Sequence, residues 1–117
     1  MKSISFCIAT AKNEREYVKL LLDSLQKHTQ IQNHEILIFI DSDNQGTYDM
    51  LLKIQETLPN LKIHRNIDKY PIGAQRNISL MFNEASNDIT CYLQSDMVVG
   101  KDFDKHIIAN ISENVIL

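Results

Sequence analysis

Three short polar segments hold the side chains that could do chemistry, and each follows an apolar run. They are residues 10–14, 41–43 and 94–96. The third segment is the most informative, because Asp96 ends the apolar run 89–93 with a carboxylate. A carboxylate oxygen can hold a hard divalent cation, and the cation can in turn hold a diphosphate. The alternative is that Asp96 only caps a turn after a strand.

A fourth segment could bind an anion. Arg76 follows Gly73 near the start of a predicted helix, where backbone N–H groups and a guanidinium could face an anion together. Simpler interpretations also exist for these polar residues. Arg76 could lie on a solvated helix surface, Asn13 could be a helix N-cap, and Asp41 and Asp43 could be turn residues.

Apolar patterning predicts the elements that must position these residues. Continuous apolar runs at 4–10, 35–40 and 89–93 predict strands covered on both faces, and 61–64 predicts a shorter strand. Helical spacing predicts four helices, which begin at the capping pair Asn13 and Glu16, at Thr47, at Ala74 and after the cap Asp102. They are expected to end near His28, at Pro59, near Ala85 and near Ile111.

Strands that alternate with helices predict a single α/β domain over residues 1–117, with a three-layer, doubly wound, mainly parallel sheet. Ligands bind outside the carboxyl ends of such strands, so the polar segments should converge there. The last residues, 115–117, look like the start of another strand. This pattern suggests a fragment, a short gene product, or a truncated edge that a second copy of the chain could complete as a homo-oligomer.

Composition narrows the possible partners. A net charge of −3 and a pI near 5.7 argue against nucleic acid or an anionic membrane as the ligand. No apolar run approaches the roughly 20 residues that cross a bilayer, and the first run is too short for a signal sequence. Cys7 and Cys91 lie in predicted strands without metal-binding spacing, which favours reduced thiols in a cytoplasmic protein.

Several common α/β sites are missing from the sequence. It contains no GxGxxG, GxxxxGK[ST] or GxSxG motif, which argues against dinucleotide, P-loop and α/β-hydrolase sites. A phospho-acceptor receiver domain would need a pair of acids after the first strand, where this chain has Lys12 and Glu14.

Together the segments resemble a family 2 glycosyltransferase of GT-A fold. Lys12-Asn13-Glu14 after the first apolar run, then the run ending at Asp41 and followed by Gly46-Thr47, look like the beginning of that family. Residues 73–77 are similar to its third helix start, and residues 92–96 fall where its DXD motif lies. The order and spacing match over nearly all of the chain.

The resemblance implies binding of a nucleotide-diphospho-sugar donor, in particular a UDP-sugar, with Mg²⁺ or Mn²⁺ as cofactor. Asp41 would accept the imide N–H of uracil, and Asp96 would hold the metal. The other nucleotide-binding residues would be Thr10, Lys12 and Glu14 beside the nucleoside, Arg76 at the diphosphate, and Ser95 next to the metal. The activity implied is sugar transfer to an acceptor hydroxyl, such as that of a glycan in polysaccharide assembly.

Three departures from the family pattern limit this expectation. Gln94 and Met97 stand where acids are common, and Lys12 stands where an aromatic residue is frequent. The acceptor-binding half and the catalytic base of the family lie beyond the DXD region, so we assign no catalytic residue and expect the isolated chain to be incomplete for catalysis. Two alternatives remain, a non-catalytic nucleotide-binding or assembly module and a nucleotidyltransferase. The latter would need a Gly-rich basic loop that residues 11–13 do not supply.

Overall fold

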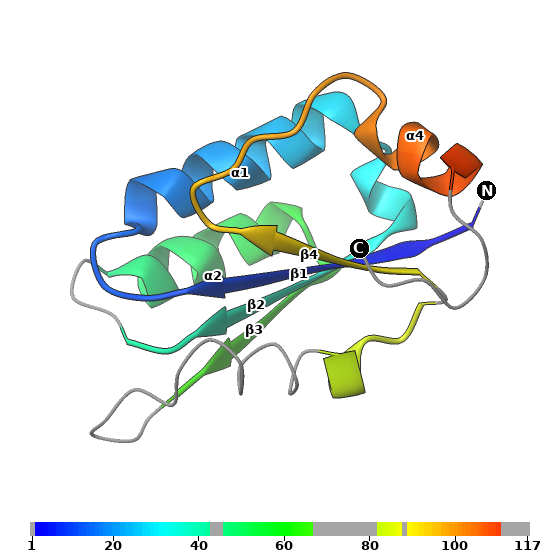
Figure 1. Ribbon diagram of the computed structural model, residues 1–117. Helices are drawn as coiled ribbons and strands as arrows, with labels where there is room; N and C mark the ends of the chain where they lie inside the picture. The colour runs from blue at the N-terminus through cyan, green and yellow to red at the C-terminus, as the bar shows by residue number, and fades with distance from the viewer. Residues whose placement is uncertain (1, 43–45, 67–81, 88, 111–117) are drawn as a thin grey trace.

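A parallel β-sheet forms the centre of the computed structural model, which describes residues 2–42, 46–66, 82–87 and 89–110 (Figure 1). The sheet has four strands in the order β3-β2-β1-β4, and every pairing is parallel. Its strands are β1 (Ile4–Thr10), β2 (Glu35–Ile40), β3 (Leu61–Arg65) and β4 (Ile89–Gln94). The predicted α/β class with a parallel sheet is therefore confirmed.

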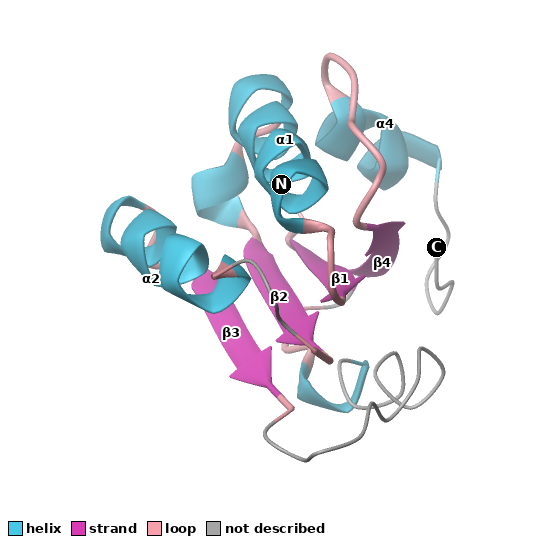
Figure 2. Cartoon of the chain, turned by 90° about the vertical axis from the view of Figure 1, so that its left-hand side faces the viewer, coloured by secondary structure: helices cyan, strands magenta, loops and turns pink. Residues whose placement is uncertain are grey.

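Helices lie on both sides of this sheet. The helices α1 (Arg15–His28), α2 (Thr47–Thr57) and α4 (Phe103–Asn110) cover one face, with a short 3-10 helix η1 (Ile31–Asn33) between α1 and β2 (Figures 1 and 2). A helical turn at residues 82–84 lies on the opposite face. This is the three-layer arrangement that the sequence predicted.

The two faces of β1 explain its continuous apolar sequence. Its residues Ile4, Phe6 and Ile8 are fully buried toward the helices, where α1 contributes the side chains at the predicted spacing, namely Val18, Leu21, Leu22 and Leu25. Cys7 faces the other way with Leu37 of β2, and Phe82 and Ala85 pack on these two. Because both sides are covered, polar alternation would leave unpaired polar groups in the core.

The start of α1 differs from the prediction. Asn13 and Glu16 do not form the expected capping pair, because the helix begins at Arg15 and its N-cap residue is Glu14, which makes no side-chain capping bond. Asn13 instead has a left-handed backbone conformation (φ 66°), which asparagine adopts more readily than most residues. It turns the chain between the end of β1 and the helix.

The other helix boundaries follow the predictions where the structure describes them. α2 begins at Thr47 after Gly46, whose φ of 73° costs a glycine little, and ends at Thr57, two residues before Pro59. α4 begins directly after Asp102, whose carbonyl oxygen accepts a hydrogen bond from the backbone N–H of His106 (3.0 Å). The predictions for residues 74–81, for Ile111 and for the strand at 115–117 lie outside the described residues.

A buried His–Asp pair attaches α4 to the start of the sheet. The backbone N–H of Ile4 donates to Nδ1 of His34 (3.0 Å), so the ring proton of His34 lies on Nε2. That nitrogen donates to Oδ2 of Asp104 (2.8 Å), which also accepts from the backbone N–H of Gln30 (2.9 Å). Burial raises the pKa of Asp104, but these donors outweigh it and lower that pKa below its ordinary value.

Both cysteines are free and buried, as predicted. Burial raises the pKa of Cys7 to about 12, helped by the charge of Glu35, and raises the pKa of Cys91 to about 11. Thiols with such pKa values are almost entirely protonated at neutral pH, which makes them poor nucleophiles. Within the described residues, no helix combines the length and apolar character needed to cross a membrane.

A buried carboxylate, Glu35, connects the amino ends of the strands. Its Oε1 accepts from the Ser5 hydroxyl (2.6 Å) and from the backbone N–H of Ser86 (2.9 Å), and its Oε2 pairs with Lys62 Nζ. Burial raises the pKa of Glu35, but the bonds from Lys62, Ser5 and Ser86 outweigh it and lower that pKa to about 2. The carboxylate therefore stabilises the fold in its charged form.

This lowered pKa predicts an acid-dependent loss of stability. The contribution of Glu35 is complete above about pH 4.5 and is lost as the pH falls from there towards 2, a change on the order of 3 kcal/mol. The variant Glu35→Gln should therefore be less stable at pH 7 and lose less further stability on acidification. Urea unfolding at several pH values measures this. The exposed Glu56→Gln serves as the control, and an unchanged pH profile in Glu35→Gln would contradict the assignment.

Candidate functional site

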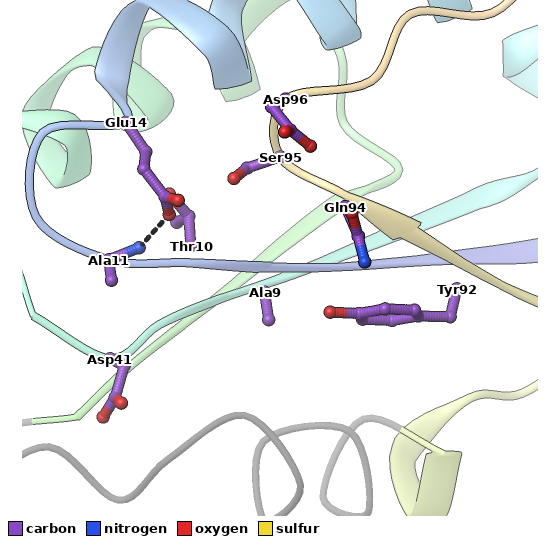
Figure 3. Close-up of a pocket in the computed structure, with 9 residues that line it drawn as sticks. All are labelled: Ala9, Thr10, Ala11, Glu14, Asp41, Tyr92, Gln94, Ser95 and Asp96. Atoms are coloured by element: carbon purple, nitrogen blue, oxygen red, sulfur yellow. Dashed lines mark hydrogen bonds between the residues drawn. The ribbon is translucent and has the colours of Figure 1, made fainter.

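A cavity of about 320 Å³ lies at the carboxyl ends of β1, β2 and β4. The strand register explains its position, because Thr10 pairs with Ile40 and Ala9 pairs with Gln94, so the residues that follow these strands meet at one edge. Figure 3 shows the nine residues that line it, which are Ala9, Thr10, Ala11, Glu14, Asp41, Tyr92, Gln94, Ser95 and Asp96. The predicted convergence of the three polar segments is therefore observed.

Glu14 forms one wall and is fixed by the end of β1. Its Oε1 accepts from the backbone N–H of Ala11 (2.7 Å) and from the Thr10 hydroxyl (3.2 Å). The carboxylate thus turns back toward the strand end (Figure 3). This contact closes the β1–α1 connection and places a negative charge at the edge of the cavity.

Asp41 forms a second wall of the cavity, and contacts with residues of the neighbouring strands fix its position. Its side chain is buried, its backbone N–H donates to the carbonyl oxygen of Thr10 (2.9 Å), and its Oδ1 accepts from the Asn66 side chain (2.9 Å). The Asn66 backbone N–H donates to the carbonyl oxygen of Ile40 (2.8 Å), which fixes the amide beside the carboxylate. A carboxylate has about four acceptor positions, so the contact with Asn66 orients Asp41 while occupying only part of its acceptor capacity.

Ser95 and Asp96 occupy a tight turn directly after β4. The turn is closed by the backbone N–H of Met97, which donates to the carbonyl oxygen of Gln94 (3.1 Å). Ser95 is buried (5% exposed), and its hydroxyl has no hydrogen-bond partner among the described residues, whereas Asp96 is exposed. Both line the cavity (Figure 3), so the turn presents a hydroxyl and a carboxylate to the same space.

Tyr92 is a lining residue that the sequence analysis did not assign to the site. Its ring lies beside Ala9, with the hydroxyl directed toward that residue (Figure 3). Burial raises the pKa of Tyr92, and the negative charge of Glu14 raises it further, so the phenol stays neutral. Strand alternation could have identified it, because Tyr92 lies two residues before Gln94 and therefore on the same face of β4, opposite to Leu93. Ala9 was also missed, whereas Ala11 and Gln94 lie in the polar segments that were predicted to converge but were given no binding role.

Of the remaining predicted site residues, one lies outside the cavity lining and the other is not described by the structure. Lys12 is exposed and is not a lining residue, although it lies between Ala11 and Glu14 in the chain. Arg76 lies outside the described residues, so its role stays a prediction. The described lining therefore contains the three carboxylates Glu14, Asp41 and Asp96 and no lysine or arginine.

The donor set indicates which kind of metal site could form here. The described part of the chain contains no group of three or more His, Cys, Asp or Glu side chains that could hold a metal ion. Asp96, however, offers a carboxylate next to the Ser95 hydroxyl and the Gln94 amide. Mg²⁺ commonly binds to one or two carboxylates together with substrate phosphates, so the residues fit a metal that arrives with its ligand.

Comparison with known proteins gives a family match over most of the chain. The sequence pattern of the family described as "Glycosyl transferase family 2" matches residues 6–116. No curated protein matches the chain in sequence.

Solved structures share the fold. TarS 1–349 of S. aureus in complex with UDP-GlcNAc has a TM-score of 0.79 at 24% identity, over 93% of this chain and 30% of that one. The same protein in complex with UDP has a TM-score of 0.78 at 23% identity, over 93% and 31%. The mannosyltransferase PcManGT from Pyrobaculum calidifontis, in complex with GDP-Man and Mn²⁺, has a TM-score of 0.70 at 16% identity, over 85% and 29%. The present chain thus spans about a third of each structure.

Proposed function

The chain belongs to glycosyl transferase family 2 and has its GT-A fold, and we propose that its cavity binds the nucleotide part of a UDP-sugar donor. The observation that carries this proposal is the convergence of Asp41 and Asp96, from two different strands, on one cavity. The parent reaction would transfer the sugar to an acceptor hydroxyl, such as that of a glycan. The cavity is assigned the donor-binding step of that reaction.

The charge of the cavity supports a role for a divalent metal. A nucleoside diphosphate is an anion, and the described lining residues with formal charge are all carboxylates. A divalent cation would offset this repulsion, and Asp96, with Ser95 and Gln94 as adjacent oxygen donors, would hold Mg²⁺ or Mn²⁺ together with the diphosphate. When bound, such a metal neutralises the diphosphate leaving group. The Mn²⁺ in the PcManGT complex is consistent with this choice.

The position of Asp41 supports recognition of the base. Its carboxylate is buried and oriented by Asn66 on the β2 side of the cavity, away from the turn that carries Asp96. A charged acceptor can discriminate between bases, because a hydrogen bond from a ligand N–H to a carboxylate contributes about 1.5–3 kcal/mol and a base without that N–H cannot form it. Uracil offers an imide N–H, whereas cytosine offers a ring nitrogen that is itself an acceptor. UDP in the TarS complexes fits this preference.

The variant Asp96→Asn tests the metal contact. Wild-type protein should bind UDP by calorimetry in Mn²⁺ and much more weakly in EDTA. Asp96→Asn should lose about tenfold or more in affinity in Mn²⁺ and show no loss in EDTA, because the carboxylate acts through the metal and without it only repels the diphosphate. The matched control is Asp102→Asn in the same β4–α4 connection, where the side chain pairs with Lys105.

Two results would contradict this assignment. If the variant Asp96→Asn binds UDP in Mn²⁺ as tightly as the wild type does, Asp96 does not hold the metal. A wild type that binds neither UDP, GDP nor CDP would overturn donor binding and favour a non-catalytic assembly module.

The variant Asp41→Ala separates base recognition from metal binding. It should bind UDP about tenfold to a hundredfold more weakly, because a hydrogen bond to a charged acceptor is lost, while CDP binding changes little. Its dependence on Mn²⁺ should remain. The comparison is the ratio of UDP to CDP affinity at fixed metal and salt. Equal discrimination by wild type and variant would return Asp41 to the role of a turn residue without a ligand.

A further inference from the structure

The connection between β4 and α4 is fastened to α1 at two points. The backbone N–H of Val99 donates to the Ser24 hydroxyl oxygen (3.1 Å), and the backbone N–H of Asp102 donates to the carbonyl oxygen of His28 (3.0 Å). Figure 1 shows this connection running along α1. These two hydrogen bonds fix the position of the β4–α4 connection relative to α1.

Ser24 has the hydrogen-bonding capacity for this role. Its hydroxyl donates to the carbonyl oxygen of Leu21, one turn earlier in α1 (2.8 Å), and so keeps an oxygen lone pair directed at Val99. The Val99 side chain is buried in the main core (6% exposed). This burial helps to keep the Val99 backbone N–H next to α1. The serine thus accepts a backbone N–H that comes from 75 residues further along the chain.

Only two residues separate this contact from the carboxylate of the site. Met97 and Val98 lie between Asp96 and Val99, and their side chains are 43% and 64% exposed. Neither side chain is buried, although the Met97 sulfur accepts a hydrogen bond from the backbone N–H of Gln94 (3.4 Å) within the turn. The position of Asp96 depends on the turn after Gln94 on one side and on the Val99 contact on the other.

We propose that Ser24 is a positioning residue for the site, which acts through Val99 to place the Asp96 carboxylate opposite Glu14. The inference rests on the proposed function, since it concerns the metal-dependent binding of a nucleoside diphosphate. α1 positions both carboxylates. Glu14 immediately precedes its first turn, and Ser24, which holds the connection that carries Asp96, lies in its last turns. Metal–ligand distances tolerate errors of only about 0.2 Å, so a small displacement of the turn weakens binding of the metal and its diphosphate.

The test compares UDP binding by wild type, Ser24→Ala and Ser24→Thr, with Mn²⁺ and with EDTA. Alanine has a higher helix propensity than serine, so the substitution should not weaken binding through a loss of helix stability. Ser24→Ala should bind UDP about three- to tenfold more weakly in Mn²⁺ and be unchanged in EDTA, while Ser24→Thr should recover most of the loss. The matched control is Thr57→Ala, which removes a hydroxyl that donates to the carbonyl oxygen of Ile54 within α2 and makes no hydrogen bond to the β4–α4 connection.

Hydrogen exchange of the Val99 amide provides a readout that needs no ligand. Its exchange should become about tenfold faster in Ser24→Ala and remain slow in Ser24→Thr. Exchange that is equally slow in all variants would overturn the contact, and an equal loss of UDP affinity in Mn²⁺ and EDTA would overturn the positioning role. Absence of UDP binding by the wild type would overturn the proposed function, and the exchange result then decides alone whether Ser24 holds the connection.

Discussion

The parallel pairing of β1 with both β2 and β4 is the constraint on which the site depends. β1 is buried on both faces, and its register with its two neighbours leaves no freedom in where their carboxyl ends lie. A shift by one residue would turn the apolar side chains of a strand to the wrong face. The same hydrophobic packing that fixes the register therefore also brings Thr10, Asp41 and Ser95 together.

The electrostatics of the cavity follow from this geometry. Strand ends in this chain carry carboxylates, and those of Glu14, Asp41 and Asp96 surround one cavity of about 320 Å³. Glu14 is engaged by the backbone of Ala11, and Asp41 is engaged by Asn66, whereas Asp96 is exposed at the turn. A concentration of negative charge of this kind favours cations and neutral hydrogen-bond donors over free phosphates. This charge pattern is the reason we propose a metal for nucleotide binding and a base contact for Asp41.

Much of this arrangement was predictable because it depends on local patterns. Apolar runs identified the strands, and the rule that ligands bind at the carboxyl ends of parallel strands selected Asp96 and the segment 41–43, within which the family resemblance singled out Asp41. The prediction that Asn13 caps the first helix was wrong. The Glu14 carboxylate accepts the backbone N–H of Ala11 at the end of β1, and the helix therefore begins one residue later, with Glu14 as its N-cap residue. Ser24 carries no local signal at all, since its partner lies 75 residues away and only tertiary structure brings them together. Glu35, a charge inside an apolar run, depends in the same way on partners from distant segments.

Paramagnetic NMR with Mn²⁺ tests the central claim most directly, because Mn²⁺ broadens the signals of nuclei close to it. The account predicts that Mn²⁺ with UDP broadens the amide signals of Ser95, Asp96 and Met97 most strongly. Mn²⁺ without UDP should broaden them much less, because the described residues form no preformed metal cage. UDP should also shift the amide signal of Asp41. Broadening centred on another surface, or unchanged signals at residues 94–97 with both ligands present, would contradict the account.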